Sequence, residues 1–128
     1  MKPEMKRLPE AELQVMLAVW QCGDKSSASD ILSVLNKDWA LPTLMTVLSR
    51  LSKKGYLFCE KQGRNNVYHI LITEETYQQM ESKTLLENLF HNSFQSFVTT
   101  LYNGKHLKKS ELDELRTFLD RLESEDKK

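Results

Sequence analysis

The chain has 128 residues, of which 40% are hydrophobic and 28% are charged, and its mean hydropathy is −0.51. This apolar content is enough for a hydrophobic core and excludes a wholly disordered protein. The longest apolar run, Val15 to Trp20, is far shorter than the ~20 residues that a membrane-spanning helix needs. No charged-then-apolar leader opens the sequence and two cysteines are too few for a disulfide framework, so we expect a cytoplasmic protein with no direct membrane insertion.

The net charge of zero conceals an asymmetry between the two halves. Residues 1–72 carry 10 Lys and Arg against 7 Asp and Glu, whereas residues 73–128 carry 8 against 11. The basic residues of the first half cluster between positions 50 and 64, where Glu60 is the only acid. Attraction to phosphate depends on such local clusters within a Debye length of ~8–10 Å, so the neutral total does not exclude a nucleic-acid partner.

Apolar residues spaced three and four apart predict three short helices in the first half of the chain. Their inner positions are Leu13, Met16, Leu17 and Trp20 in the first helix, Ala28, Ile31, Leu32 and Leu35 in the second, and Leu44, Val47, Leu48 and Leu51 in the third. Pro9 and Gly23 suit the two ends of the first helix. Ser26-Ser27 offers a cap for the second helix, and Gly55 closes the third.

The chain then changes to extended, aromatic-rich segments. Residues 56–61 and 67–72 have strand character, and residues 62–66, Gln-Gly-Arg-Asn-Asn, are rich in turn-forming types. Three helices followed by a hairpin with a basic tip are the order of a winged helix-turn-helix. We therefore predict this fold for residues 1–72.

From Thr73 onward the spacing is helical again. It continues through Tyr77 and Phe90 to a break at Asn103-Gly104, and a last helix follows. We expect residues 73–128 to form a separate helical region. The predicted fold class is α+β, mostly helical, with the winged helix-turn-helix at the N-terminal end.

The outer face of the third predicted helix favours DNA binding. Four of its polar residues lie three or four positions apart and form one stripe, and residues 43–54 contain no acid, whereas an ordinary solvated helix face mixes acids and bases. An α-helix fits the ~12 Å major groove, where hydroxyls and arginine can contact base edges and phosphates. We expect DNA contacts from Thr43, Met45, Thr46, Ser49, Arg50, Lys53 and, on the hairpin tip, Arg64.

The C-terminal helices display more apolar surface than a lone pair can bury. We expect these helices to form a homodimer across a twofold axis, so residues 73–128 are predicted to be a dimerisation domain. The alternative is that they fold back on the winged helix as ordinary core. The predicted dimerisation residues are Phe90, Phe94, Phe97, Leu101, Leu112, Leu115, Leu119 and Leu122.

The sequence offers no catalytic or metal-binding constellation. It contains no nucleophile–base pair, phosphate-binding glycine loop or paired catalytic carboxylates. The histidines at positions 69, 91 and 106 are not grouped with Cys22 or Cys59 at ligand spacing. We expect neither an enzyme nor a cofactor or metal requirement.

Residues spread over nearly the whole chain carry a family pattern. They are Glu12, Val15-Met16 and Trp20, then Asp38-Trp39, Thr43, Thr46, Arg50-Leu51, Lys53-Lys54-Gly55-Tyr56 and Tyr68, and finally Ser110-Glu111-Leu112-Asp113-Glu114-Leu115. With these residues the chain resembles the BlaI/MecI/CopY family of bacterial repressors. The resemblance implies a dimeric winged-helix repressor on an inverted repeat in a promoter. The family's DNA-contacting positions carry over to Thr43, Thr46 and Arg50, and its wing contact to Arg64.

Several positions depart from that family. Where β-lactam-responsive members have a lysine and an arginine on the recognition helix, this chain has Pro42 and Met45. Those members are cleaved in the dimerisation region between Asn and Phe, a position that aligns with Thr100-Leu101 here. Copper-responsive members end in two Cys-x-Cys pairs, but this chain has no cysteine after Cys59, which excludes copper sensing by that device.

The sequence therefore predicts a homodimeric repressor that is released when its dimerisation region is cleaved or disturbed and that controls β-lactam-response or related genes. A membrane sensor-protease is a further possible partner. One alternative is a winged-helix repressor with a small-molecule site lined by Tyr77, Phe90, Phe94 and Tyr102. Another is a protein-interaction module that does not bind DNA.

Overall fold

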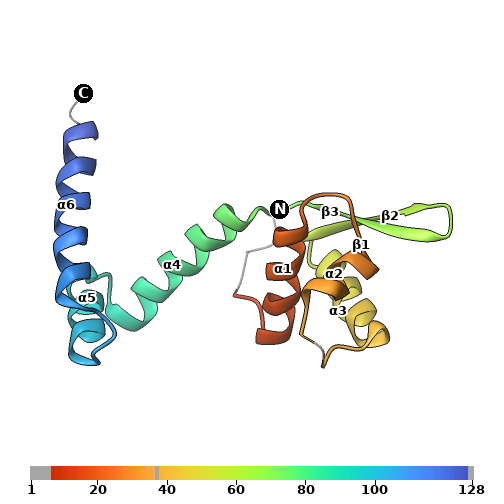
Figure 1. Ribbon diagram of the computed structural model, residues 1–128, viewed down its shortest axis with the longest axis horizontal. Helices are drawn as coiled ribbons and strands as arrows, with labels where there is room; N and C mark the ends of the chain where they lie inside the picture. The colour runs from red at the N-terminus through yellow and green to blue at the C-terminus, as the bar shows by residue number, and fades with distance from the viewer. Residues whose placement is uncertain (1–6, 37, 127–128) are drawn as a thin grey trace. The chain divides into compact units, whose positions relative to one another are not determined.

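The computed structural model describes residues 7–36 and 38–126, and in these ranges it contains six helices and one three-stranded sheet (Figure 1). In chain order the elements are α1 (Glu10–Cys22), β1 (Ser26–Ser27), α2 (Ala28–Val34), α3 (Leu41–Lys53), β2 (Leu57–Gln62), β3 (Asn65–Ile70), α4 (Glu74–Phe90), α5 (Phe94–Asn103) and α6 (Lys109–Asp126). The predicted mostly helical α+β fold with an N-terminal winged helix is confirmed.

The chain divides after Ser82 into two compact units. The first unit holds α1–α3, the sheet and the beginning of α4, and the second holds the rest of α4 with α5 and α6. The predicted functional boundary at residue 72 stays a prediction. Within the described ranges, no helix has the length and apolar run needed to cross a membrane.

Helix α1 has the predicted ends, and three of its four predicted inner residues, Leu13, Met16 and Trp20, lie in or against the core. Pro9 precedes its first residue and Gly23, at a φ of 93°, ends it. The side chains turned inward include Val15, Met16 and Val19, whereas Leu17, expected in the core, is 48% exposed. The prediction was wrong at Leu17 because the run from Val15 to Trp20 is apolar on every side of the helix, so spacing alone does not fix the exact face.

Local capping and periodicity explain α2 and α3. The Ser27 hydroxyl accepts the backbone N–H of Asp30, and the Asp30 carboxylate accepts the N–H of Ser27, both at 3.1 Å. In α3 the four predicted leucine and valine positions are all buried, Pro42 lies in the first turn, and Gly55 adopts a φ of 85° just after the helix. The predicted cap and the predicted inner face of α3 are confirmed.

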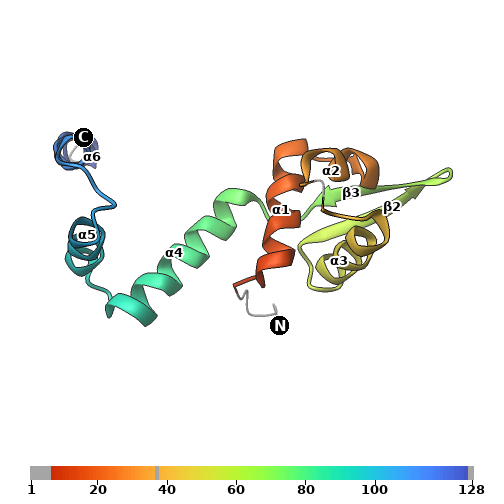
Figure 2. The ribbon, with the colours of Figure 1, turned by 60° about the horizontal axis from the view of Figure 1, so that its bottom comes forward.

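The sheet has the order β1-β3-β2 and is antiparallel throughout. Gln62 pairs with Asn65, so the turn of the hairpin consists only of Gly63, at a φ of 63°, and Arg64. The predicted five-residue turn was therefore too long. Ser26 and Ser27 form β1 on the other edge of β3, a strand that is too short to give a sequence pattern. Figure 2 shows the hairpin extending beyond the three helices.

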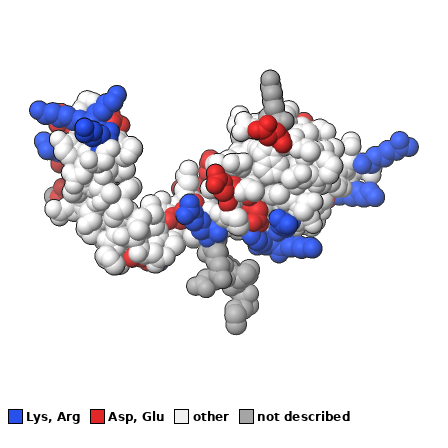
Figure 3. All heavy atoms as spheres, turned by 90° about the horizontal axis from the view of Figure 1, so that it is seen from below, with Lys and Arg blue, Asp and Glu red and all other residues white. Residues whose placement is uncertain are grey.

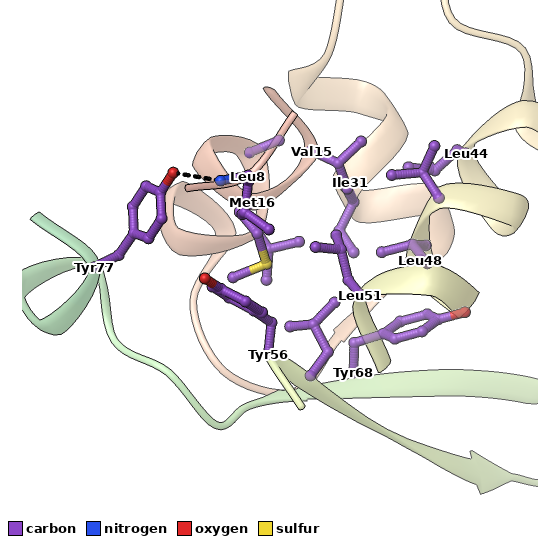
Figure 4. Packing of buried hydrophobic residues seen from close by; sticks show 14 residues of the cluster. Leu8, Val15, Met16, Ile31, Leu44, Leu48, Leu51, Tyr56, Tyr68 and Tyr77 are labelled. Atoms are coloured by element: carbon purple, nitrogen blue, oxygen red, sulfur yellow. Dashed lines mark hydrogen bonds between the residues drawn. The ribbon is translucent and has the colours of Figure 1, made fainter. Parts of the chain in front are cut away.

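The hydrophobic core lies in the first unit (Figure 4). Tyr77, near the start of α4, is 2% exposed, and its hydroxyl accepts the backbone N–H of Leu8 at 2.9 Å. Its ring lies 5.7 Å from that of Trp20 and 6.1 Å from that of Tyr56. The Trp20 indole N–H donates to the carbonyl of Ile72 at 3.0 Å. These contacts join the beginning of α4 to the winged helix.

The second unit has a break that the sequence did not predict. His91 and Asn92, at φ of 50° and 64°, separate α4 from α5, and the hydroxyl of Ser93 caps α5 by accepting the N–H of Ser96. The expected continuous helix to Asn103-Gly104 was therefore wrong. Within residues 83–125, no side chain is buried.

Candidate nucleic-acid interface

The outer face of α3 carries a continuous polar stripe. Its members, Thr43, Thr46, Ser49, Arg50 and Lys53, are all exposed, whereas the leucines on the opposite face are buried. Because residues three and four apart lie on one face of a helix, the amphipathic packing of α3 turns these side chains away from the core. Helix α3 contains no acidic residue.

Thr46 has a defined hydrogen bond within this stripe. Its hydroxyl donates to the carbonyl oxygen of Pro42, one turn earlier, at 3.1 Å. A threonine hydroxyl has one proton and two acceptor lone pairs. The bond therefore fixes the direction of the side chain and leaves acceptor capacity on an exposed oxygen.

Met45, also predicted to contact DNA, lies differently. It is half-buried and packs against the core, and its sulfur accepts the hydroxyl of Tyr68 in β3 at 3.9 Å. The structure therefore brings Met45 to the contact between α3 and the hairpin and not to the exposed stripe. Sequence spacing placed Met45 beside Thr46 on the outer face of the helix. The contact of Met45 with Tyr68 depends on the position of β3, which spacing does not give.

The hairpin tip supplies the second basic group of the first unit. Arg64 occupies the two-residue turn and Lys61 the adjoining part of β2, and both are exposed. Figure 3 shows blue side chains at the outer end of the hairpin with no red ones beside them on that face. Among the described residues, no carboxylate lies within 4.0 Å of the charged nitrogens of Arg50, Lys53, Lys61 or Arg64. These cations are available to an external anion.

Lys54 differs from its neighbour Lys53. Its ammonium nitrogen lies 2.6 Å from Oε1 of Glu12, a carboxylate of α1 that is 7% exposed. This ion pair joins the C-terminal end of α3 to the buried face of α1. Sequence reasoning counted Lys54 with the basic cluster, and no local signal distinguishes it from Lys53.

The base of the hairpin is held by acidic residues that the sequence analysis did not single out. His69 in β3 lies with Nε2 2.6 Å from Glu60 in β2 and with Nδ1 3.7 Å from Asp24 in the loop before β1. Asp24 also accepts the backbone N–H of Ile70 at 2.7 Å, and this bond lowers the pKa of its carboxyl. The hairpin is thereby joined to the loop between α1 and β1.

The predicted dimerisation residues all lie in the second unit and remain at least partly exposed. Phe97 contacts both Phe90 and Phe94, with ring centroids 5.2 and 6.2 Å apart. The structure thus brings the three phenylalanines together, whereas Leu119 and Leu122 on α6 are left open. The exposure classes are half-buried for Phe90, Phe97, Leu101, Leu112 and Leu115, and exposed for Phe94, Leu119 and Leu122.

The structure also gives the positions of the predicted cleavage pair and of the residues predicted to line a small-molecule site. Thr100 and Leu101, the possible cleavage pair, lie inside α5, so their peptide bond is part of a helix. Of the residues proposed to line a small-molecule site, Tyr77 is buried in the core of the first unit, while Phe94 and Tyr102 are exposed in the second.

Comparisons with known proteins agree with this architecture. Residues 8–121 match the family model described as penicillinase repressor. The penicillinase repressor of Bacillus licheniformis is 31% identical over 121 residues, which are 91% of this chain and 94% of that protein. The methicillin resistance regulatory protein MecI of Staphylococcus aureus (strain N315) is 28% identical over 116 residues, 89% of this chain and 94% of that one. The solved DNA-binding domain of the repressor BlaI is 34% identical, with a TM-score of 0.50, over 60% of this chain and 94% of the domain.

Proposed function

Because this chain belongs to the penicillinase repressor family, whose members are transcriptional repressors and not enzymes, we propose that it is a homodimer that represses transcription by occupying an inverted-repeat operator. It acts in the cytoplasm, where that DNA is found. The observation that carries the proposal is the acid-free, exposed stripe of α3, with Arg50 and Lys53 free of carboxylate partners in the described part of the chain.

The chemistry of the stripe and the hairpin suits the two kinds of DNA contact. In the proposed complex α3 lies in the major groove, where Thr43, Thr46 and Arg50 reach base edges. Lys53 and Ser49 contact phosphates, and Arg64 at the tip contacts a phosphate or the adjacent minor groove. The likeness to the DNA-binding domain of BlaI supports this assignment.

The proposal of a homodimer rests on the second unit. A segment that buries none of its described side chains gains little hydrophobic stabilisation by itself, because that stabilisation is proportional to the apolar area removed from water. A second copy covers this surface and holds two α3 helices on successive major grooves, about one or two helical turns of ~10–10.5 bp apart.

Release follows from loss of that bivalent arrangement. We propose that the operator is freed when the second unit is cleaved or disturbed. The candidate cleavage site is the peptide bond between residues 100 and 101, and the proposed partner for this step is a membrane sensor-protease. The proposed targets of repression are β-lactam-response or related genes. Because the bond lies in α5, cleavage requires local unfolding of this helix. Mass spectrometry of the chain during induction tests this step. An intact chain that has left the operator favours direct ligand binding instead.

The DNA-binding function is tested by a gel-shift titration with the DNA upstream of the protein's own gene. We expect Arg50→Ala to weaken specific binding by ~1–3 kcal/mol, roughly 5- to 150-fold. Lys83→Ala, an exposed lysine of the second unit, is the matched control and leaves the affinity unchanged. If the unmodified protein binds no DNA in the titration, the protein-interaction alternative replaces the proposal. If the unmodified protein binds and Arg50→Ala binds with the same affinity, Arg50 does not belong to the DNA-binding site.

A further inference from the structure

The segment before α1 contacts the beginning of α4. The backbone N–H of Leu8 donates to the hydroxyl of Tyr77 at 2.9 Å, and both side chains are buried (Figure 4). Nε of Arg7 lies 3.1 Å from Oε1 of Glu81. Residues 7–9 therefore join α4 to the N-terminal end of α1, and we call them the N-terminal strap.

The two contacts hold one face of α4 at two heights. Tyr77 and Glu81 are four residues apart, about one turn, so they are separated by about 6 Å along the axis. A helix that is held at one point can pivot, whereas a helix held at two points along its axis has a fixed direction. The preceding residue Ile72 is also held, because its carbonyl accepts the indole N–H of Trp20 at 3.0 Å.

The two contacts of the strap differ in strength. The bond between Leu8 and Tyr77 is buried, and breaking it leaves a backbone N–H away from water without an acceptor, which is costly. The side chain of Arg7 is 71% exposed and that of Glu81 is 29% exposed, and so exposed an ion pair contributes little by itself. The hydrogen bond is therefore the main contact and the ion pair the secondary one.

The beginning of α4 matters to a repressor that binds DNA with two copies of α3. One added base pair between two half-sites moves one of them by ~3.4 Å along the DNA and rotates it by about 34–36° around the DNA axis. A dimer follows this change only if the connection between its DNA-binding and C-terminal units yields. Helix α4 runs from the first unit into the second, so the contacts at its beginning belong to that connection.

We propose that the N-terminal strap fixes the direction in which α4 begins and thereby makes the repressor select operators by the spacing of their half-sites. The inference rests on the homodimer of the proposed function and adds the residues that set its spacing preference. On an operator with the wrong spacing, both α3 helices reach their half-sites only if the strap opens, and the free energy of opening is lost from binding. On the matched operator the strap stays closed.

Tyr77→Phe opens the strap with the least change, because it removes the hydroxyl that accepts the Leu8 N–H and keeps the buried ring. The probes are the inverted repeat that the protein occupies upstream of its own gene, the same repeat with its centre lengthened or shortened by one and by two base pairs, and a duplex with a single half-site. Gel-shift titrations of the full chain give the affinity for each duplex. Hydrogen exchange of the Leu8 amide, measured by NMR, shows whether the strap has opened.

We expect Tyr77→Phe to bind the mis-spaced repeats about 2- to 10-fold more tightly than the wild-type chain does, which is the factor of one hydrogen bond. No gain is expected on the matched repeat or on the single half-site. Loss of stability alone lowers all of these affinities, so a selective gain is specific to the strap. An unchanged ratio of matched to mis-spaced affinity, or a wild-type chain that binds every spacing equally, overturns the inference and leaves the proposed repressor intact.

Glu81→Gln tests the secondary contact without a change in the core, and its gain should lie at the lower end of the same range. Glu75→Gln, which removes an exposed carboxylate from the same helix, is the matched control and leaves the ratio unchanged. If Tyr77→Phe fails to fold, Glu81→Gln and Arg7→Gln decide the question.

The same titrations separate this inference from the function on which it rests. A wild-type chain that binds neither the repeat nor the half-site contradicts the proposed DNA-binding function. A wild-type chain that binds the repeat no better than the half-site contradicts the homodimer. Either result also removes the basis of the spacing preference.

Discussion

The ammonium of Lys54 lies 2.6 Å from the carboxylate of Glu12 and connects the end of α3 to the interior side of α1. The neighbouring Lys53 has no such partner among the described residues and is exposed. Two successive lysines therefore serve different purposes. Lys54 holds the candidate recognition helix in place, and the ammonium of Lys53 is open to an external anion.

Lys54→Met should lower the free energy of unfolding because it leaves the Glu12 carboxylate buried without its cation. Since 44% of the Lys54 side chain is exposed, we expect about 1–3 kcal/mol, less than the loss of a fully buried partner. Lys53→Met is the matched control and should change stability by less than about 0.5 kcal/mol. Urea denaturation measures both variants, and equal midpoints would show that the ion pair contributes nothing.

Arg64→Ala should weaken operator binding mainly through loss of a phosphate contact. Because each such contact releases counterions, we expect the slope of log affinity against log salt concentration to fall by about one unit, with similar effects on specific and random DNA. Gel shifts at several salt concentrations give the slope. A slope equal to that of the unchanged protein would place the hairpin tip away from the phosphates.

Met45→Leu should leave operator affinity within about twofold of that of the unchanged protein, because the half-buried side chain faces Tyr68 and the swap conserves volume. Its destabilisation should stay below about 1.5 kcal/mol. Fluorescence anisotropy with labelled operator measures the affinity. A large loss of binding at unchanged stability would return Met45 to the DNA-contacting set.

Tyr77 gives the protein a pH dependence on the alkaline side. Burial raises the pKa of its phenol to about 12 from 10.0, so folding favours the neutral form. The stabilisation is intact below pH ~10 and is lost as the pH rises toward ~12, by about 2–3 kcal/mol in total. Tyr77→Phe removes this group, and its stability should fall less steeply over the same range of pH in urea titrations.

The elements that sequence reasoning predicted well are those with a single clear signal. Helix α3 alternates buried leucines with an acid-free polar face, and both faces lie where the pattern placed them. Helix α1 offered apolar residues on all sides, so its buried face depended on packing with α2 and α3. The break at His91 and Asn92 contains neither glycine nor proline, and its local signals, an asparagine at positive φ and the capping Ser93, are weak beside the apolar spacing that runs across it.

For the candidate site, the residues of the stripe could be predicted, but the contacts made by their neighbours Met45 and Lys54 could not. The pairing of Lys54 with Glu12, and of Met45 with Tyr68, joins residues far apart in the sequence. Such contacts depend on how the helices cross and on the register of β3, which composition and spacing do not specify.

The hydrogen bond from Thr46 to the carbonyl of Pro42 has a consequence for discrimination between bases. The hydroxyl has a single proton, and the helix itself already binds it. Toward a facing groove Thr46 is therefore acceptor-only, with a methyl group alongside. Such a side chain complements the exocyclic amino group of adenine or cytosine, or the methyl of thymine, and has no donor for the O6 and N7 of guanine.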